Sequence, residues 1–336
     1  MNNQRLLKLF FIPFIALIVG CHQTDQPKFK ADTSKIDLQP IKIKRYDKAF
    51  FAVNPSHFKE GLIAIAPSYP LFLKINLNDT SIINDLKRFA VDTSIRKLSN
   101  DVQKKYSNIS PIENQLTDAF KRTAFFFKGY TAPQIYTYIS GLDYLYPIRY
   151  DGDNMAISID LYLGKDYLQY KKVQLPNYKI RNMTPERLLP DCMTEVAKLI
   201  LSDIKPGNTL LDKMIYEGKV LLFLDAVIPE TPDSIKIGYT SNQLTWCNKN
   251  ASNIWKYFIE NKLLYASNPE LTKKFIQDSP FTTSFGRESA PRFGAWTGWQ
   301  IIREFMNKNS SVSIEQLFKM TDSQTILEKS GYKPEE

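Results

Sequence analysis

Histidine is scarce in this chain of 336 residues, which contains only two, His22 and His57. A zinc hydrolase usually binds its metal through two or three histidines, and a serine or cysteine hydrolase needs a histidine base beside its nucleophile. His22 stands near the start of the chain and His57 stands alone in a helical pattern. The histidine content therefore excludes zinc hydrolysis in its usual form and leaves little material for a catalytic triad.

Other signatures of chemistry are also absent. The sequence has no phosphate-binding G-x-x-x-x-G-K-[ST] loop, no dinucleotide-binding G-x-G-x-x-G and no G-x-S-x-G nucleophile elbow. Its formal charge is +9, but basic and acidic residues are interspersed, which does not predict a nucleic-acid partner. The D-G-D-N run at Asp151 and Asp153, even with Asp160, lacks the ligand series of a calcium loop and predicts a turn. We therefore expect neither a metal nor another cofactor.

Only three cysteines occur, at positions 21, 192 and 247. An exported location would permit a disulfide between Cys192 and Cys247. Cys192 lies among apolar residues of a predicted helix, which favours a buried free thiol instead.

The start of the chain has the pattern of a secretory signal. Arg5 and Lys8 precede an apolar run from Leu9 to Val19, which is short for a membrane span. The run ends in L-I-V-G-C, similar to a bacterial lipobox, so we expect residues 1–20 to be removed and Cys21 to carry the acyl chains, palmitate among them. This predicts a lipid-anchored protein of the cell envelope with a periplasm-facing domain, and leaves open whether the inner or the outer membrane holds it.

The rest of the chain predicts one helix-rich α+β domain with a small β-sheet, over residues 41–336. The polar segment after Cys21, to residue 40, predicts a flexible tether. Thr184 and Pro185 begin a helix that Pro190 is expected to break, so that Asp191 caps a second helix to about residue 202. The expected strands are 134–139 and 155–163, and the other expected helices are 55–65, 79–106, 111–128, 209–227, 241–265, 293–307, 313–320 and 322–329.

The predicted helix after Asp191 contains the frame of a zinc motif without its histidines. In H-E-x-x-H the two histidines share a helix face and bind the metal, and the glutamate polarises the bound water. Here Thr194, Glu195 and Lys198 occupy these three positions. A threonine hydroxyl is a poor zinc ligand, and the lysine ammonium repels the cation.

Glu217 adds a second feature of such a site. It interrupts an apolar stripe at helical spacing, so a carboxylate falls on a face directed to the core. One class of zinc peptidases takes its third ligand from a glutamate about twenty residues after the second histidine, and Glu217 follows Lys198 by nineteen residues. The glutamates match this spacing, and both histidines are missing.

Three segments carry a resemblance to a known family. They read S-I-D-L-Y-L-G-K-D (158–166), M-I-Y-E-G-K-V-L-L-F-L-D-A-V-I-P (214–229) and R-F-G-A-W-T-G-W-Q-I-I (292–302). After a lipobox, these segments resemble the GldB family of gliding-motility lipoproteins, which is related to predicted zinc peptidases with an intact H-E-x-x-H. The resemblance implies a zincin-like fold in which the strand around Ile159 lies beside the degenerate helix. It places Thr194 and Lys198 at the histidine positions, Glu195 at the general base and Glu217 at the third ligand.

The favoured function is that of a non-catalytic, membrane-anchored structural or interaction component of the gliding and associated secretion machinery. Its partners would be other envelope proteins of that machinery. One alternative is a hydrolase of zincin descent that uses Glu195 with an unusual metal or none. Another is a binding module that keeps the old cleft for a peptide or a glycan.

Two further expectations concern side chains around this site. We expect Lys198 to form a partly buried ion pair with Glu217 in place of the metal, with a Glu217–Lys213 pair as the alternative. Gly294 and Gly298 alternate with Trp296 and Trp299, which favours close packing in the core over a lining of the cleft. Arg287 and Arg292 flank this helix and leave a carboxylate partner or solvent as open alternatives.

Overall fold

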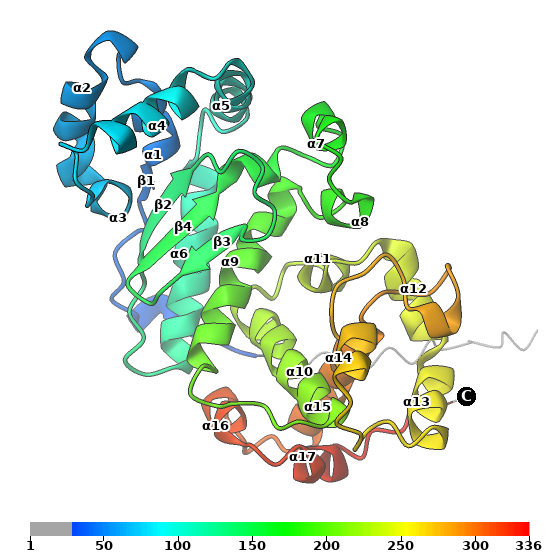
Figure 1. Cartoon of the computed structure of the whole chain (residues 1–336). Helices are drawn as coiled ribbons and strands as arrows, with labels where there is room; N and C mark the ends of the chain where they lie inside the picture. The colour runs from blue at the N-terminus through cyan, green and yellow to red at the C-terminus, as the bar shows by residue number, and fades with distance from the viewer. Residues whose placement is uncertain (1–28, 336) are drawn as a thin grey trace, which may run out of the picture.

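A four-stranded mixed sheet stands at the centre of the computed structural model, which describes residues 29–335 (Figure 1). The strand order is β1-β2-β4-β3, in which β1 and β4 run parallel to β2 and β3 runs antiparallel to β4. The strands are β1 (Ile43–Arg45), β2 (Gln134–Tyr138), β3 (Ile148–Tyr150) and β4 (Asn154–Ser158). The expected α+β class, rich in helix with a small sheet, is confirmed.

The turn between β3 and β4 is built by one aspartate. The Asp151 carboxylate accepts hydrogen bonds from the backbone N–H groups of Asp153, at 3.0 Å, and Asn154, at 2.7 Å. This confirms the predicted turn. The predicted strand 155–163 is shorter than expected, because the chain leaves the sheet at Ser158 and forms a 3-10 turn over Ile159–Tyr162.

Five N-terminal helices form a satellite unit at the upper left of Figure 1. They are α1 (Tyr46–Phe51), α2 (Phe58–Ile65), α3 (Pro70–Leu73), α4 (Thr80–Val91) and α5 (Thr93–Lys105). Helices α1 to α4 enclose a small core of their own that includes Phe50, Phe58 and Leu62, whereas Leu98 and Val102 of α5 belong to the main core. The single helix expected over 79–106 is divided at Asp92, because its carboxylate caps α5 through the N–H groups of Ser94 and Ile95.

Two long helices, α6 (Ser110–Phe126) and α9 (Pro185–Ile200), lie against the sheet, and α7 (Leu168–Lys172) and α8 (Asn177–Ile180) precede α9 (Figure 1). The expected break at Pro190 does not occur, because Pro190 lies inside α9. An internal proline costs about 3 kcal/mol, whereas each fully buried large apolar side chain contributes about 1.5–3 kcal/mol. Leu188, Met193 and Val196 are buried on this helix, and together they outweigh the proline. Asp191 is consequently a mid-helix residue and caps nothing.

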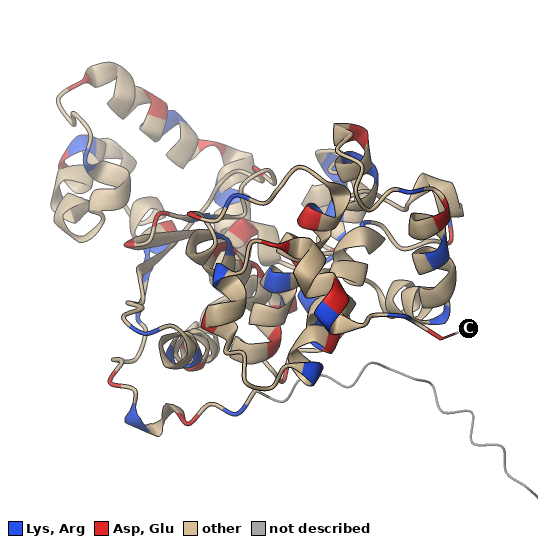
Figure 2. Cartoon of the chain, turned by 90° about the horizontal axis from the view of Figure 1, so that it is seen from below, with Lys and Arg blue, Asp and Glu red and all other residues tan. Residues whose placement is uncertain are grey.

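The C-terminal half is helical and shares the main core with the sheet (Figure 1). Its helices are α10 (Leu210–Val227), α11 (Asp233–Ile237), α12 (Ser241–Lys249), α13 (Ala251–Glu260), α14 (Pro269–Phe275), α15 (Phe293–Lys308), α16 (Ile314–Lys319) and α17 (Ser323–Ser330). The predicted helices at 209–227, 293–307, 313–320 and 322–329 are thus present, and the one expected over 241–265 is divided at Asn250. Figure 2 shows Lys and Arg interspersed with Asp and Glu over the described chain.

The described part of the expected tether, residues 29–40, lies on the domain. Phe29 and Leu38 pack against the main core, and the Phe29 ring meets Phe126 edge-on with centroids 6.1 Å apart. Apolar side chains thus hold this segment, although its overall polarity predicts a tether. The signal and Cys21 lie outside the described residues. No helix within residues 29–335 is long and apolar enough to cross a membrane.

Candidate functional site

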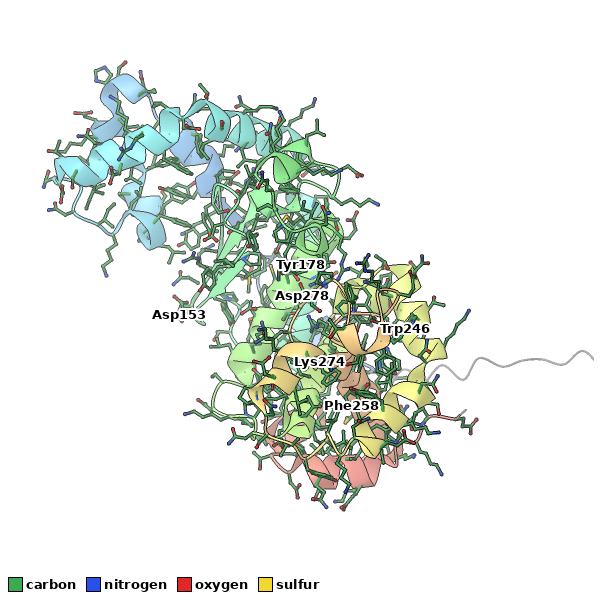
Figure 3. The ribbon with its side chains drawn as sticks, turned by 45° about the vertical axis from the view of Figure 1, so that its right-hand side comes forward. Asp153, Tyr178, Trp246, Phe258, Lys274 and Asp278 are labelled. Carbon is green, nitrogen blue, oxygen red and sulfur yellow. The ribbon has the colours of Figure 1, made fainter. Side chains whose placement is uncertain are left out.

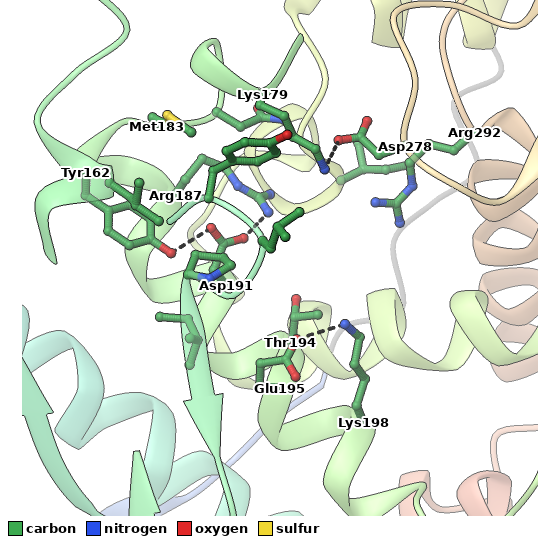
Figure 4. Close-up of a pocket in the computed structure, with 17 residues that line it drawn as sticks. Tyr162, Lys179, Met183, Arg187, Asp191, Thr194, Glu195, Lys198, Asp278 and Arg292 are labelled. Carbon is green, nitrogen blue, oxygen red and sulfur yellow. Dashed lines mark hydrogen bonds and ion pairs between the residues drawn. The ribbon is translucent and has the colours of Figure 1, made fainter. Parts of the chain in front are cut away.

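A pocket of about 290 Å³ opens beside the end of the sheet, where α8, α9, the end of α11 and the segment between α14 and α15 meet (Figure 4). Thr194, Glu195 and Lys198 all line it. The three residues singled out in the zinc frame therefore share one face of α9, and that face borders a cavity. Glu217 stands on α10, and its ion-pair partner Arg292 lines the same pocket.

The predicted ion pair between Lys198 and Glu217 is wrong. Lys198 Nζ lies 2.8 Å from Glu195 Oε1, one turn away on its own helix, and Glu217 Oε2 lies 3.2 Å from Arg292 Nη2. The alternative pair of Glu217 with Lys213 is also wrong. Arg292 immediately precedes α15, which packs along α10, so its long side chain reaches Glu217 across the helix interface.

The two pairs differ in their surroundings. The Lys198 and Glu195 side chains are 43% and 34% exposed, a setting in which an ion pair contributes about 0–1 kcal/mol. The Arg292 and Glu217 side chains are 25% and 20% exposed, so solvent screens that pair less.

Asp191 forms the floor of the pocket (Figure 4). Its carboxylate accepts hydrogen bonds from the Tyr162 hydroxyl, at 3.0 Å, and from the Arg187 guanidinium one turn earlier on α9. Burial raises the pKa of the Asp191 carboxyl above its ordinary value, although Arg187 and Tyr162 act in the opposite direction. Arg187 is held in turn by the backbone carbonyls of Ile235 and Lys236, which tie α9 to α11.

The opposite wall is formed by an ion pair between two segments far apart in sequence. Lys179 Nζ on α8 lies 3.1 Å from Asp278 Oδ2, just after α14. Figure 3 shows Asp278 beside Tyr178, the neighbour of Lys179. This pair closes the pocket between the sheet side of the molecule and its helical half.

Arg292 has an unusual backbone. Its φ and ψ angles are 40° and 37°, in the left-handed region that residues with a side chain rarely adopt. Such a conformation costs about 1–3 kcal/mol and persists only where the surroundings impose it. The preceding carbonyl, that of Pro291, accepts a 2.7 Å hydrogen bond from the buried Tyr239 hydroxyl, which fixes the turn. The sequence gives no signal of this turn.

The arrangement offers little to a metal ion. Within residues 29–335 no group of three or more His, Cys, Asp or Glu side chains is placed to bind one. The carboxylates that line the pocket each face a cation, namely Asp191 with Arg187, Glu195 with Lys198 and Asp278 with Lys179. The pocket is therefore lined by ion pairs, and each of its three carboxylates already has a cationic partner.

A buried charge cluster lies next to this site, and the sequence motifs do not predict it. Asp225 of α10 accepts from Arg303 Nε and Nη2, each at 2.8 Å, from Lys236 Nζ at 2.9 Å and from Trp299 Nε1 at 2.8 Å. Arg303 also binds Asp233 of α11. The cluster joins α10, α11 and α15. A charged residue inside the apolar run 220–228 is the one sequence signal for it.

The glycines and tryptophans of α15 pack in the core, which agrees with the interpretation that the sequence favours over a lining of the cleft. Trp296 and Trp299 are 3% and 0% exposed. Gly298 lies against the backbone carbonyl of Met214, where a Cβ atom would stand 1.8 Å from the oxygen. Cys192 and Cys247 are buried free thiols, which confirms the favoured interpretation and excludes a disulfide between them in this structure.

The sequence model of a protein family described as gliding motility protein GldB matches residues 26–334. No curated protein and no solved structure matches the chain.

Proposed function

The chain belongs to the GldB family of gliding motility proteins, and on that premise we propose that it acts as a lipid-anchored, non-catalytic component of the gliding machinery in the cell envelope. Its role would be structural or interactive, through contacts with other envelope proteins of gliding and the associated secretion. The proposal includes descent from zincin-like peptidases. The placement of Thr194, Glu195 and Lys198 on one face of α9, bordering a pocket, supports that descent.

One observation carries the non-catalytic part of the proposal. Both glutamates that a zinc peptidase of this class would use are ion-paired with cations, Glu195 with Lys198 and Glu217 with Arg292. A general base must be free to take a proton from water, and a metal ligand must offer its lone pairs to the ion. Here each carboxylate faces a cationic side chain instead.

We expect Glu195→Gln to leave gliding unchanged, because on this proposal the partly exposed carboxylate, paired with Lys198, does not act as a base. Purified mature protein is also expected to hold no stoichiometric zinc, since Thr194 and Lys198 supply no good ligand. The measurements are colony spreading at matched protein level and metal content by elemental analysis. Stoichiometric zinc that is lost in Glu217→Ala, or a spreading defect in Glu195→Gln, would instead favour the hydrolase alternative.

The anchoring part of the proposal depends on Cys21. We expect Cys21→Ser to move the protein from the membrane fraction to the soluble periplasm and to abolish spreading, because the acyl chains would be lost. Membrane fractionation and a spreading assay measure both effects. The control is Cys192→Ala, which removes a buried thiol; this variant protein should remain in the membrane fraction. Normal spreading with soluble Cys21→Ser protein would show that anchoring is dispensable.

A further inference from the structure

Arginine nitrogens around the pocket lack acceptors. Of the three guanidinium nitrogens of Arg292, only Nη2 has a hydrogen-bond partner within residues 29–335, and that partner is Glu217. Nε of Arg187 is likewise buried without an acceptor. Arg181, two residues from the pocket-lining Lys179, has Nε and Nη2 buried and unpartnered. A buried donor left without a partner costs about 1–3 kcal/mol, and more where the group is charged.

Arg303 provides an internal standard for a satisfied guanidinium. Its Nε and Nη2 hold both oxygens of the Asp225 carboxylate at 2.8 Å, and Nη1 and Nη2 hold Asp233. In Arg303 the two donors on one side of the guanidinium, Nε and Nη2, thus bind a carboxylate in the bidentate geometry that is common for arginine. The same edge is unpartnered in Arg181, and Nε is unpartnered in Arg187 and Arg292.

The charge of the pocket lining points to a single negative charge. Four cationic side chains line it, Lys179, Arg187, Lys198 and Arg292, against the three carboxylates of Asp191, Glu195 and Asp278. The lining therefore carries one more positive than negative charge. Counting Arg181, which lies behind the lining, and Glu217, which pairs with Arg292, adds one charge of each sign and leaves this excess of one unchanged. Burial lowers the pKa of Arg181; the nearby Asp278 carboxylate acts in the opposite direction, and the nearby Arg292 guanidinium acts in the same direction as burial.

The other wall of the pocket is apolar. It is formed by Leu145, Pro147, Ile148, Leu161, Met183 and Ile237. Leu145 is 67% exposed at the rim. A volume of about 290 Å³ stands at the lower end of small-ligand pockets, which span about 300–1,000 Å³. The space suits one small apolar group beside one anionic head.

We propose that this pocket binds a ligand that carries one carboxylate next to an apolar group, as the C-terminal residue of a peptide or a small acylated amino acid does. Arg292 is the principal contact, because it lines the cavity and Glu217 is the one hydrogen-bond partner of its guanidinium within residues 29–335 (Figure 4). The apolar wall takes the side group, and the positive charge of Arg187 at the floor favours the carboxylate without a direct hydrogen bond, because both of its Nη atoms already bind protein acceptors. This inference rests on the proposed non-catalytic function in one respect: the protein binds the ligand and does not cleave it.

The test uses the mature chain with Cys21→Ser, which leaves every described residue intact. The probes are N-acetyl-leucine, its amide N-acetyl-leucinamide, a tripeptide acid ending in leucine, and inorganic phosphate. The readout is the ¹H–¹⁵N signals of the arginine Nε–H groups during titration. We expect the acids to shift the Arg292 and Arg187 signals and the amide to leave them in place. Tighter binding of the tripeptide identifies a peptide terminus as the source, and equal binding identifies a small acid.

Variants locate the site. Arg292→Gln should weaken binding about tenfold or more, the usual effect of losing a charged hydrogen bond. Lys256→Gln, on the exposed surface of α13, should leave affinity unchanged. Glu217→Gln frees Nη2 of Arg292 and should retain or strengthen binding, which guards against a folding defect in the first variant. Equal binding of acid and amide, binding of phosphate alone, or absence of any shift overturns the proposal. None of these outcomes bears on zinc content or spreading, so the proposed function is judged separately.

Discussion

Replacing Asp225 by alanine is expected to lower the free energy of unfolding by about 3–5 kcal/mol, the cost of removing one partner from a buried ion pair. The Asp225 side chain is 2% exposed and accepts hydrogen bonds from Arg303, Lys236 and Trp299. Lys236 and Arg303 are themselves 0% and 2% exposed at the side chain, so the substitution leaves two cations in the core with Asp233 as their remaining carboxylate. Urea denaturation followed by circular dichroism measures the loss.

The matched control is an ion pair on the surface. Asp85 and Arg88 pair one turn apart on α4, with side chains 69% and 79% exposed, so Asp85→Ala should cost only about 0–1 kcal/mol. A second test removes the charges together. Asp225→Leu with Arg303→Met, Lys236→Met and Asp233→Asn should recover much of the loss, because uncharged groups of similar volume often replace a buried ion cluster without penalty. If Asp225→Ala costs no more than Asp85→Ala, the cluster does not stabilise the fold.

This cluster also supports the pocket. Lys236 and Asp233 belong to α11, whose Ile237 lines the apolar wall. The carbonyls of Ile235 and Lys236 hold Arg187, which in turn holds Asp191. Loss of Asp225 would therefore loosen α11 and with it the floor of the pocket. A shift of the Arg187 Nε–H signal in Asp225→Asn would report that coupling.

Sequence periodicity predicted the long apolar helices well, because the spacing of apolar residues that marks a buried helix face can be read within one short segment of the sequence. The helix bounds at 209–227 and 293–307 agree with α10 and α15 to within one or two residues, and the zinc frame was correctly placed on one helix face. The predictions were wrong where packing against distant segments outweighs a local sequence preference. Pro190 breaks helices in isolation, yet the packing of α9 keeps it continuous.

The pairing of Lys198 and Glu217 could not be settled from spacing. Spacing along the chain shows which residues share a helix face, and it contains nothing about which helix supplies the opposite charge. Arg292 reaches Glu217 only because a left-handed turn and a close helix contact bring the start of α15 to that point. The pocket is likewise made by segments around residues 145, 179, 195, 237 and 278, which no local pattern joins.

Gly298→Ala is expected to destabilise the protein by about 3 kcal/mol or more, at the upper end of the cost of overpacking. In a helix interior alanine is otherwise favoured over glycine by about 1 kcal/mol, so the sign of the change tests the packing directly. A Cβ at position 298 would stand 1.8 Å from the backbone oxygen of Met214, and one at Gly218 would stand 2.4 Å from the backbone oxygen of Gly298. Neither contact is with a side chain that can rotate away, so α10 and α15 must separate.

That separation should reach the pocket, because Glu217 on α10 and Arg292 at the start of α15 pair across the same interface. Gly298→Ala is therefore expected to shift the Arg292 Nε–H signal as well as to lower the urea midpoint. The neighbouring Thr297→Ala is the control, since its hydroxyl bonds to the Phe293 carbonyl of its own helix and its loss should cost about 1 kcal/mol. A Gly298→Ala protein as stable as the parent, with an unmoved Arg292 signal, would mean that the two helices do not approach this closely. In that case the geometry that aims Arg292 into the pocket would need another origin.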